Sequence, residues 1–303
     1  MVKSLASAGS AKMEQGVNNI VTKGIGASRI IAIANQKGGV GKTTTAINLA
    51  TALAATGKSV LILDLDPQGN ASTGLGIGPK DRGLGSYGLI HGSELDAVII
   101  KSDVPGLSVI PSTPDLAGLE IELIQTEKPQ FRLRKALLGV NYGELDESAE
   151  SGISVLEEWD YVLIDCPPAL GMLTVNAMVS SDAVLVPLQC EFFALEGLTQ
   201  LLGAVEKIKL AFNPTLKIQG VVLTMFDKRN NLSDQVAQDV RTHLGDLVYD
   251  TVIPRNVRMS EAPSFGRPAL LYDFHCAGAQ AYIHLAGELL RREKKLISVG
   301  DSL

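Results

Sequence analysis

Residues 29–44 read Arg-Ile-Ile-Ala-Ile-Ala-Asn-Gln-Lys-Gly-Gly-Val-Gly-Lys-Thr-Thr and indicate the fold class of the whole chain. The run Ile30–Ala34 is short, apolar and β-branched, which predicts a buried strand. A glycine-rich turn follows, and Lys42 and Thr43 open an Ala- and Leu-rich run that predicts a helix. A strand, a glycine turn and Lys-Thr at a helix start form a phosphate-binding geometry, because N–H groups at the helix N-terminus point at the anion.

The glycine turn departs from the general phosphate-loop pattern in one respect. The pattern G-x-x-x-x-G-K-[ST] requires glycine where this chain has Gln36, and Lys37 stands at the next position. The string matches the deviant form of the loop, which carries an extra signature lysine. Lys42 is expected to reach the β/γ oxygens and Thr43 to hold Mg²⁺. The residues expected to bind nucleotide here are Lys37, Gly38, Gly39, Val40, Gly41, Lys42, Thr43 and Thr44.

Two further apolar strand patterns end in carboxylates. Asp64 and Asp66 lie at the end of one, and Asp165 ends another. Carboxylates beyond the carboxyl ends of parallel strands face the ligand crevice. We therefore expect Asp66 to orient an attacking water near the metal's water shell, and Asp165 to bind Mg²⁺ through water. Asp64 is expected to touch that shell or the loop backbone.

Strand patterns alternate with helical patterns along most of the chain, and most strand patterns are apolar on both faces. This predicts a single α/β domain of the P-loop NTPase type, doubly wound, with a mainly parallel sheet flanked by helices. The predicted strands are Ile30–Ala34, Val60–Leu65, Leu107–Ile110, Tyr161–Ile164, Ala183–Leu188, Ile218–Leu223 and Val248–Ile253. The predicted helices are Thr43–Thr56 (closed by Gly57), Pro114–Glu127, Gln130–Leu138, Leu195–Phe212, Ser233–His243 and Ala277–Lys295.

Length, composition and charge limit the size of the core, the number of domains and the surfaces that the chain can form. The chain has 303 residues, of which 46% are hydrophobic, so it can bury a large core. Residues 1–28 are predicted to be a flexible tail, residues 29–303 the ATPase-type domain, and about 141–154 an exposed acidic insertion. Six acidic residues between 141 and 158, without Lys or Arg, equal the net charge of −6, so a local basic face remains possible elsewhere.

Two further features bear on location. The longest uncharged stretch, 166–181, is shorter than the ~20 residues of a bilayer span, so no membrane association is expected. The three cysteines form no CxxC pair, which favours a reduced, cytoplasmic setting. Cys166 is expected to be a small buried filler rather than a nucleophile, since no histidine lies near it in sequence.

Several strings together closely resemble the ParA/Soj chromosome- or plasmid-partitioning ATPases, from about Arg29 to Leu290. The phosphate loop alone would indicate only the wider family that includes MinD, the nitrogenase iron protein and the arsenite-pump ATPases. The strings that begin at Gln189 and Ile253 narrow the resemblance to the ParA/Soj proteins. The strings are Lys37-Gly-Gly-Val-Gly-Lys-Thr-Thr, Asp64-Leu-Asp-Pro-Gln-Gly-Asn, Asp165-Cys-Pro-Pro, Gln189-Cys-Glu-Phe-Phe-Ala-Leu-Glu-Gly-Leu and Ile253-Pro-Arg-Asn-Val-Arg-Met-Ser-Glu-Ala-Pro.

The resemblance implies an enzyme that hydrolyses ATP with Mg²⁺ and acts as a dimer switch. Two subunits sandwich two ATP molecules, and Lys37 reaches the partner's nucleotide, so that Lys37, Lys42 and Asp66 are the implied catalytic residues. The metal would involve Thr43, Asp66 and Asp165.

The implied output of this switch is DNA positioning. The homodimer binds double-stranded DNA without sequence preference, and a ParB-type centromere-binding protein stimulates hydrolysis. Pro254 and Asn256 fall where the family holds adenine, and Arg229 and Arg258 where it contacts DNA. Met225 packs near the base or belongs to the core. The implied location is cytoplasmic and nucleoid-associated.

Three alternatives use the same loop. A MinD-like membrane-cycling ATPase needs a terminal amphipathic helix, of which Leu289–Ile297 shows a hint interrupted by Glu293. An iron–sulfur carrier needs two cysteines per subunit that converge at a dimer axis, and the cysteines here show no ligand pattern. A metabolic synthase or kinase would need a separate substrate pocket, which the sequence does not indicate.

Overall fold

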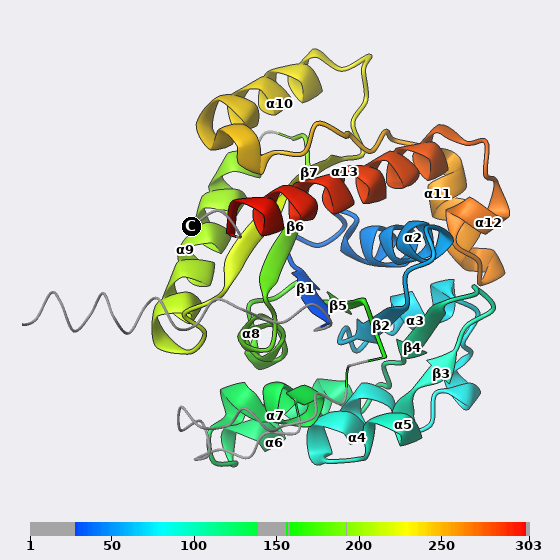
Figure 1. The fold of residues 1–303 in the computed structure, drawn as a ribbon, viewed down its shortest axis with the longest axis vertical. Helices are drawn as coiled ribbons and strands as arrows, with labels where there is room; N and C mark the ends of the chain where they lie inside the picture. The colour runs from blue at the N-terminus through cyan, green and yellow to red at the C-terminus, as the bar shows by residue number, and fades with distance from the viewer. Residues whose placement is uncertain (1–27, 139–155, 157, 192, 301–303) are drawn as a thin grey trace, which may run out of the picture.

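A computed structural model describes residues 28–138, 156, 158–191 and 193–300. The predicted tail, up to residue 27, and the predicted acidic insertion at 141–154 lie outside the described residues. The described chain forms one α/β domain built on a single sheet (Figure 1).

The sheet has seven strands in the order β3-β4-β2-β5-β1-β6-β7. All neighbouring strands pair in parallel except β3 and β4, which are antiparallel. The first βα unit places β1 near the centre, and the crossovers run to both sides of it, as in a doubly wound sheet. The strands are β1 (Arg29–Ile33), β2 (Val60–Asp64), β3 (Ile100–Lys101), β4 (Leu107–Ile110), β5 (Tyr161–Asp165), β6 (Ala183–Gln189) and β7 (Lys217–Thr224).

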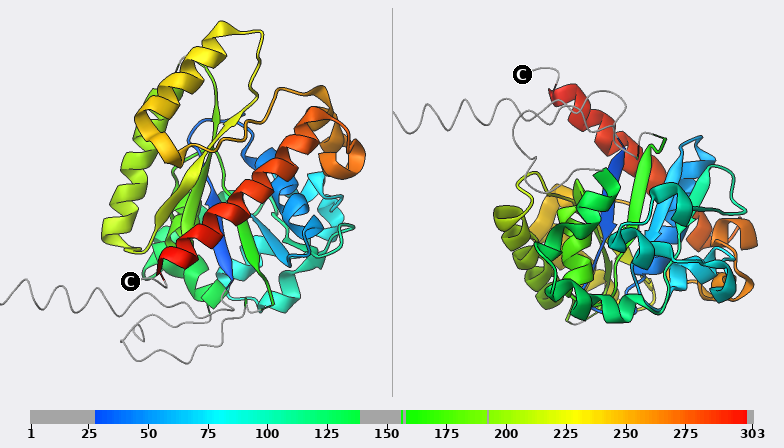
Figure 2. Two further views of the ribbon diagram at one scale, coloured as in Figure 1. Left: turned by 45° about the horizontal axis from the view of Figure 1, so that its top comes forward. Right: turned by 90° about the horizontal axis from the view of Figure 1, so that it is seen from below.

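Helices cover both faces of the sheet, so most strand side chains meet an apolar layer (Figure 2). One face packs against α2, α3, α11, α12 and the long α13, which crosses the sheet in the left panel of Figure 2; the other packs against α4 to α10. The helices are α2 (Lys42–Ala55), α3 (Asn70–Gly74), α4 (Gly85–His91), α5 (Leu95–Val98), α6 (Leu116–Ile124), α7 (Arg132–Leu138), α8 (Met172–Val179), α9 (Ala194–Ala211), α10 (Asn231–Leu244), α11 (Val257–Glu261), α12 (Ala269–Tyr272) and α13 (Ala277–Gly300).

The predicted fold class is confirmed, and most predicted elements appear within two or three residues of their expected bounds. Gly57 follows the C-cap of α2 with φ +85° and donates to Ala54 O, as expected of a residue that closes a helix. The short helices α3, α4, α5, α8, α11 and α12 were not predicted. Each has four to eight residues, too few for an apolar period to stand out in sequence.

The predicted strand at 248–253 is wrong. Val248 forms only an isolated bridge with Val221, and the segment keeps only single backbone hydrogen bonds to β7, from Tyr249 N to Val221 O and from Ile253 N to Leu223 O. The N–H groups of Asp250 and Thr251 donate to the carboxylate of Glu288 on α13, both at 2.9 Å. Because these amides are taken by a side chain, they cannot extend a ladder along β7. The seventh strand is instead the two-residue edge strand β3.

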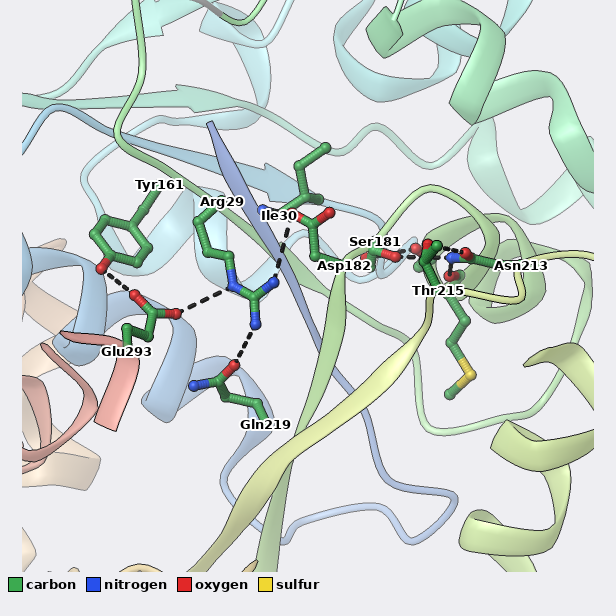
Figure 3. Close-up of polar contacts among 11 residues, drawn as sticks. Arg29, Ile30, Tyr161, Ser181, Asp182, Asn213, Thr215, Gln219 and Glu293 are labelled. Carbon is green, nitrogen blue, oxygen red and sulfur yellow. Dashed lines mark hydrogen bonds and ion pairs between the residues drawn. The ribbon is translucent and has the colours of Figure 1, made fainter. Parts of the chain in front are cut away.

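Polar contacts anchor α13 to the end of the sheet where the parallel strands begin (Figure 3). Arg29, the first residue of β1, donates to Glu293 of α13 at 3.1 Å and to Gln219 of β7 at 2.9 Å. Tyr161, at the start of β5, donates to the same Glu293. One glutamate therefore ties the C-terminal helix to two strands, at the end of the sheet opposite the phosphate loop.

Candidate nucleotide site

The phosphate loop joins the end of β1 to the start of α2. Gly39 and Gly41 have φ of +76° and +89°, a region that disfavours any residue with a Cβ. Gly41 is also the N-cap of α2, and glycine has no side chain to accept from the first N–H groups of the helix. The uncapped start of α2 therefore presents backbone donors to an anion, as the sequence predicts.

Lys42, the first residue of α2, is buried beside this loop. Its Nζ donates to the carbonyl of Lys37 at 3.1 Å, so the loop curls around the ammonium group. Burial lowers the pKa of Lys42, while the nearby Asp165, Cys166 and Asp66 oppose that shift. The lysine is thus close to both carboxylates that were predicted to complete the site.

Two carboxylates lie side by side where β2 and β5 end, since Asp64 pairs in register with Asp165. Asp64 is fully buried and accepts hydrogen bonds from Ser72 N, Ser72 Oγ and Asp66 N. Its oxygens are therefore engaged by the following loop. This loop follows β2 and is not the phosphate loop, so the expected contact of Asp64 with the phosphate-loop backbone or with the metal's water shell stays a prediction.

Asp165 is equally buried, but within the described residues neither carboxylate oxygen accepts a hydrogen bond of ordinary geometry. Burial and the neighbouring Asp64 raise the pKa of Asp165 well above its usual value, while the adjacent Thr43 hydroxyl opposes the shift. A buried carboxylate without partners is costly unless a ligand completes it. Its position opposite Thr43 fits a water-bridged Mg²⁺, so the residues present suit the metal that the sequence implies.

Asp66 lies just beyond β2 in a closed turn. Its Oδ1 accepts from Gln68 N at 3.0 Å, and its carbonyl accepts from Gly69 N at 2.8 Å and from Ser112 Oγ at 2.5 Å. Asp66 and Asp165 both act electrostatically on Lys42, so the loop brings the predicted water-orienting and metal-binding carboxylates to one place. No group of three or more His, Cys, Asp or Glu in the described ranges could by itself hold a metal, as expected where phosphates and water supply most ligands.

Burial of Asp64 leads to a pH-dependent prediction. The folded state raises its pKa from 3.8 to about 6, so the folded protein binds this proton more tightly than the unfolded chain. That contribution to stability is fully present below pH 3.8 and is lost as the pH rises through about 6. Replacing the carboxyl by the Asn amide removes it. We expect the free energy of unfolding of Asp64→Asn minus that of the unaltered protein to increase by up to about 3 kcal/mol from pH 4 to pH 7, because only the unaltered protein loses this contribution.

Urea unfolding of both proteins without nucleotide, at intervals across that range, measures this difference. Taking the difference cancels any constant cost of the substitution and the titration of groups that do not interact with Asp64; Asp165, whose pKa Asp64 raises, contributes to the difference as well. A difference that does not change with pH, or changes in the opposite direction, would contradict the assignment.

The end of β7 holds the phosphate loop from the side. Thr224 Oγ1 donates to the carbonyl of Val40 at 2.8 Å, across 184 residues of sequence. Met225 follows with φ +49°, and its Cε lies 3.8 Å from where a Cβ on Gly41 would stand. Met225 is half-buried and belongs to neither core cluster, so the core alternative for it is not supported. Sequence reasoning missed Thr224, since nothing local links it to the loop.

The two residues predicted to hold adenine, Pro254 and Asn256, lie in a segment beside the end of β7. Pro254 forms a bridge with Phe226, which brings the 253–256 segment beside the end of β7 and hence beside the loop. Asn256 Oδ1 accepts from Arg258 N at 2.9 Å and caps α11. The amide nitrogen of Asn256 is then the group left to face a base, and the adenine role stays a prediction.

The signature lysine points away from its own loop. Lys37 forms an ion pair with Glu191, which follows β6, and about half of the lysine side chain is exposed. Its backbone N–H donates to Asn35 Oδ1 at 3.0 Å, which fixes the start of the turn. An exposed ammonium group held only by a surface pair can exchange partners at low cost. The function of Glu191 was not predicted.

Both predicted DNA-contacting arginines are exposed and paired with carboxylates. Arg229 is 87% exposed and donates through Nε and an Nη to both oxygens of Asp227. Arg258 is 52% exposed and pairs with Glu261 at 2.8 Å and with Asp273 at 3.4 Å. Each arginine follows one side of the Phe226–Pro254 bridge, so the structure brings together two segments far apart in sequence. DNA phosphates would have to replace these carboxylates.

One basic residue near the end of α13, Arg292, is engaged in the fold, whereas its neighbours Arg291 and Lys294 are exposed. Arg292 donates to the carbonyls of Asp246 and Val248 and lies 4.1 Å above the ring of Tyr249. Leu285 and Leu289 of α13 are buried against the sheet, as expected of a docking helix. No helix in the part of the chain that the structure describes is both long enough and apolar enough to cross a bilayer.

Comparison with known proteins agrees with these features. A family model described as an AAA domain matches residues 28–218. The chromosome partitioning protein ParA of Caulobacter vibrioides is 60% identical over 268 residues, covering 88% of this chain and 95% of that protein. Soj, the sporulation initiation inhibitor protein of Bacillus subtilis, is 49% identical over 262 residues, covering 86% of this chain and 98% of that protein. The chain belongs to the ParA/Soj family of partitioning ATPases.

Solved structures show how the ParA/Soj fold relates to the alternatives. A cobyrinic acid a,c-diamide synthase from Mycobacterium smegmatis, with a bound ATP analogue and magnesium, has a TM-score of 0.72 at 34% identity, covering 88% of this chain and 96% of its own. MinD from Pyrococcus horikoshii, complexed with Mg-ADP, has a TM-score of 0.67 at 26% identity, covering 90% and 98%. Both resemble this chain less in sequence than the ParA and Soj proteins do, which favours the partitioning family over the synthase and MinD-like alternatives.

The remaining alternative, an iron–sulfur carrier, receives no support. Cys166, Cys190 and Cys276 are all buried and free of disulfides. Cys276 packs on one face of the sheet and the other two on the opposite face, so they do not converge. Burial raises the pKa of the Cys166 thiol, which confirms it as a buried filler and disfavours a nucleophilic role.

Proposed function

We propose that this chain hydrolyses ATP with Mg²⁺ and uses the ATP-bound dimer to hold DNA. The observation that carries the ATPase part is the buried Asp165, whose unpartnered oxygens lie opposite Lys42 and Thr43 at the uncapped start of α2. The bound nucleotides in related structures, such as AMPPNP in a putative plasmid partition protein of Borrelia burgdorferi (26% identity), support the choice of ligand.

Each residue of the site has a distinct task in this proposal. The loop amides and Lys42 bind the phosphates, and Lys42 offsets charge that develops as the γ-phosphoryl group leaves. Thr43 and Asp165 hold the metal, directly and through water. When bound, Mg²⁺ would supply positive charge that offsets the negative charge of the phosphates. Asp66 accepts a hydrogen bond from the attacking water and aligns it with the γ-phosphorus, whose bond to the bridging oxygen breaks to release ADP and phosphate.

Dimerisation follows from Lys37 in this proposal. A lysine that leaves Glu191 and reaches the nucleotide of a second subunit makes the dimer depend on ATP, because ADP lacks the γ-phosphate that it would neutralise. Two subunits then present Arg229 and Arg258 twice, on double-stranded DNA of any sequence. A ParB-type centromere-binding protein would stimulate hydrolysis and release the dimer. A protein with this activity would act in the cytoplasm, in association with the nucleoid. In this proposal residues 1–28 form a tail and residues 29–303 form the ATPase domain.

The DNA-binding part is tested by reversing charge at the two arginines. Contacts from Lys and Arg to phosphate release counterions, with a slope of roughly −0.9 per neutralised phosphate on a log–log plot of affinity against salt. Arg229→Glu and Arg258→Glu should therefore weaken ATP-dependent DNA binding for all sequences and flatten the salt slope. Co-sedimentation with DNA in ATP, in ADP and without nucleotide, at two salt concentrations, measures both effects.

Lys101→Glu is the matched control, because it makes the same change in charge on an exposed residue of β3, at the sheet edge opposite β7. It should bind DNA as the parent does. Basal hydrolysis and dimerisation should persist in all three variants, since none of these residues belongs to the phosphate loop. If both arginine variants bind DNA normally, the DNA face lies elsewhere. If Arg258→Glu loses nucleotide instead, Arg258 supports the adenine pocket.

A further inference from the structure

Arg82 is a buried arginine without an acidic partner. The residue lies in sequence between the turn at 79–81 and α4, and it is 5% exposed. Within the described residues no carboxylate forms an ion pair with it; all four of its hydrogen bonds go to neutral oxygens. Burial of a charge is costly unless its donors are satisfied by well-placed acceptors. The acceptors are Gly69 O at 3.1 Å, Thr73 Oγ1 at 2.7 Å, Ile77 O at 3.3 Å and Ser112 O at 3.1 Å.

Two of the residues that accept from Arg82 also donate hydrogen bonds to Asp66. Arg82 donates to the carbonyl of Gly69, and Gly69 N donates to the carbonyl of Asp66 at 2.8 Å. Arg82 also donates to the carbonyl of Ser112, and Ser112 Oγ donates to the same Asp66 carbonyl. Gly69 and Ser112 thus each contact the guanidinium on one side and Asp66 on the other. The carbonyl of Asp66 is therefore held by two residues that Arg82 also binds.

Gly69 is required for this arrangement. Its φ is +61°, and a Cβ at this position would lie 1.9 Å from an Nη of Arg82. Any other residue would be strained and would also displace the guanidinium. The chain therefore leaves room for the arginine within the turn that carries Asp66.

We propose that Arg82 is a positioning residue for hydrolysis, which acts by fixing the loop of Asp66. The inference rests on the proposed role of Asp66 in aligning the attacking water. Arg82 itself does not touch the phosphate loop in any contact described above, so ATP binding does not depend on it. Loss of its planar, forked donor set lets the loop shift, and a displacement of about 1 Å at a reacting group can cost about a hundredfold in rate. Lysine keeps the charge and offers no such fork.

The test measures single-turnover hydrolysis and ATP affinity for Arg82→Lys. We expect the hydrolysis rate to fall by about tenfold or more, with ATP affinity within about threefold of the parent. Arg241→Lys is the matched control, since Arg241 also donates to main-chain carbonyls, of Tyr249 and Asp250, but on α10. Its hydrolysis rate should match the parent. Ser112→Ala removes the hydroxyl bound to Asp66 and keeps the carbonyl bound to Arg82. It should also slow hydrolysis, and it provides the test if Arg82→Lys does not fold.

A double-mutant cycle separates positioning from a general effect on the fold. In the Asp66→Ala background, Arg82→Lys should slow hydrolysis no further, because the group that it positions is gone. The same fold-loss in both backgrounds would overturn the proposal, as would a parental rate for both Arg82→Lys and Ser112→Ala. A parental rate for Asp66→Ala alone would instead contradict the proposed role of Asp66, so the two failures are distinguishable.

Discussion

Asp66→Ala should bind ATP, dimerise and stay on DNA, while its single-turnover hydrolysis falls by at least about a hundredfold. The reason is that the carboxylate is expected to orient the attacking water near the metal's water shell, whereas Lys42 and the loop amides bind the phosphates. Gln68 N donates to the Asp66 carboxylate, while Gly69 N and Ser112 Oγ donate to the Asp66 carbonyl, so the substitution removes only the first of these three hydrogen bonds. Rapid mixing of the ATP-bound protein with excess Mg²⁺ measures the chemical step.

The control for this variant is Asp81→Ala. Asp81 is an exposed aspartate in the same connection between β2 and α4, and it should hydrolyse ATP as the parent does. Near-parental turnover by Asp66→Ala would remove Asp66 from the catalytic set. Loss of ATP binding would show instead that the carboxylate shapes the phosphate site.

Lys37→Ala should abolish ATP-dependent dimerisation and leave nucleotide binding by the single subunit largely intact. Lys42 and the loop amides remain, whereas the cation expected to act on the second subunit's nucleotide is lost. Light scattering across a range of protein concentrations, with ATP and with ADP, measures the oligomer. A dimer of this variant that depends on ATP would contradict the role of Lys37 across the interface.

Two further variants make the Lys37 result specific. Glu191→Gln removes the pair that holds Lys37 on its own subunit, and we expect dimerisation to persist, with at most a few-fold shift because exposed pairs contribute about 0.2–1 kcal/mol. Lys58→Ala removes another exposed lysine that pairs with an acid, Asp160, at the start of β2. It should dimerise as the parent does, since it lies at the opposite end of the strands.

The sequence alone predicted the parts of this protein that depend on local order. The string from Lys37 to Thr44 follows a strand and opens a helix, and the structure has that strand, turn and helix where they were expected. The apolar runs gave six of the seven strands, because a strand covered on both faces needs apolar residues at successive positions. The carboxylates at 64, 66 and 165 could be placed at one edge because parallel strands all end there.

Tertiary structure alone decided the contacts between elements far apart in sequence. Strand register sets Asp64 beside Asp165, which adds to the rise that burial causes in the pKa of Asp165, while Thr224 reaches the loop across 184 residues. Glu288 takes two amides from a segment whose composition predicts a strand. Arg82 donates hydrogen bonds to neutral oxygens, and no sequence motif around Arg82 predicts these contacts. Local periodicity records which face of an element is buried, but a hydrogen bond between elements depends on which surfaces pack together, and that is set by the whole chain.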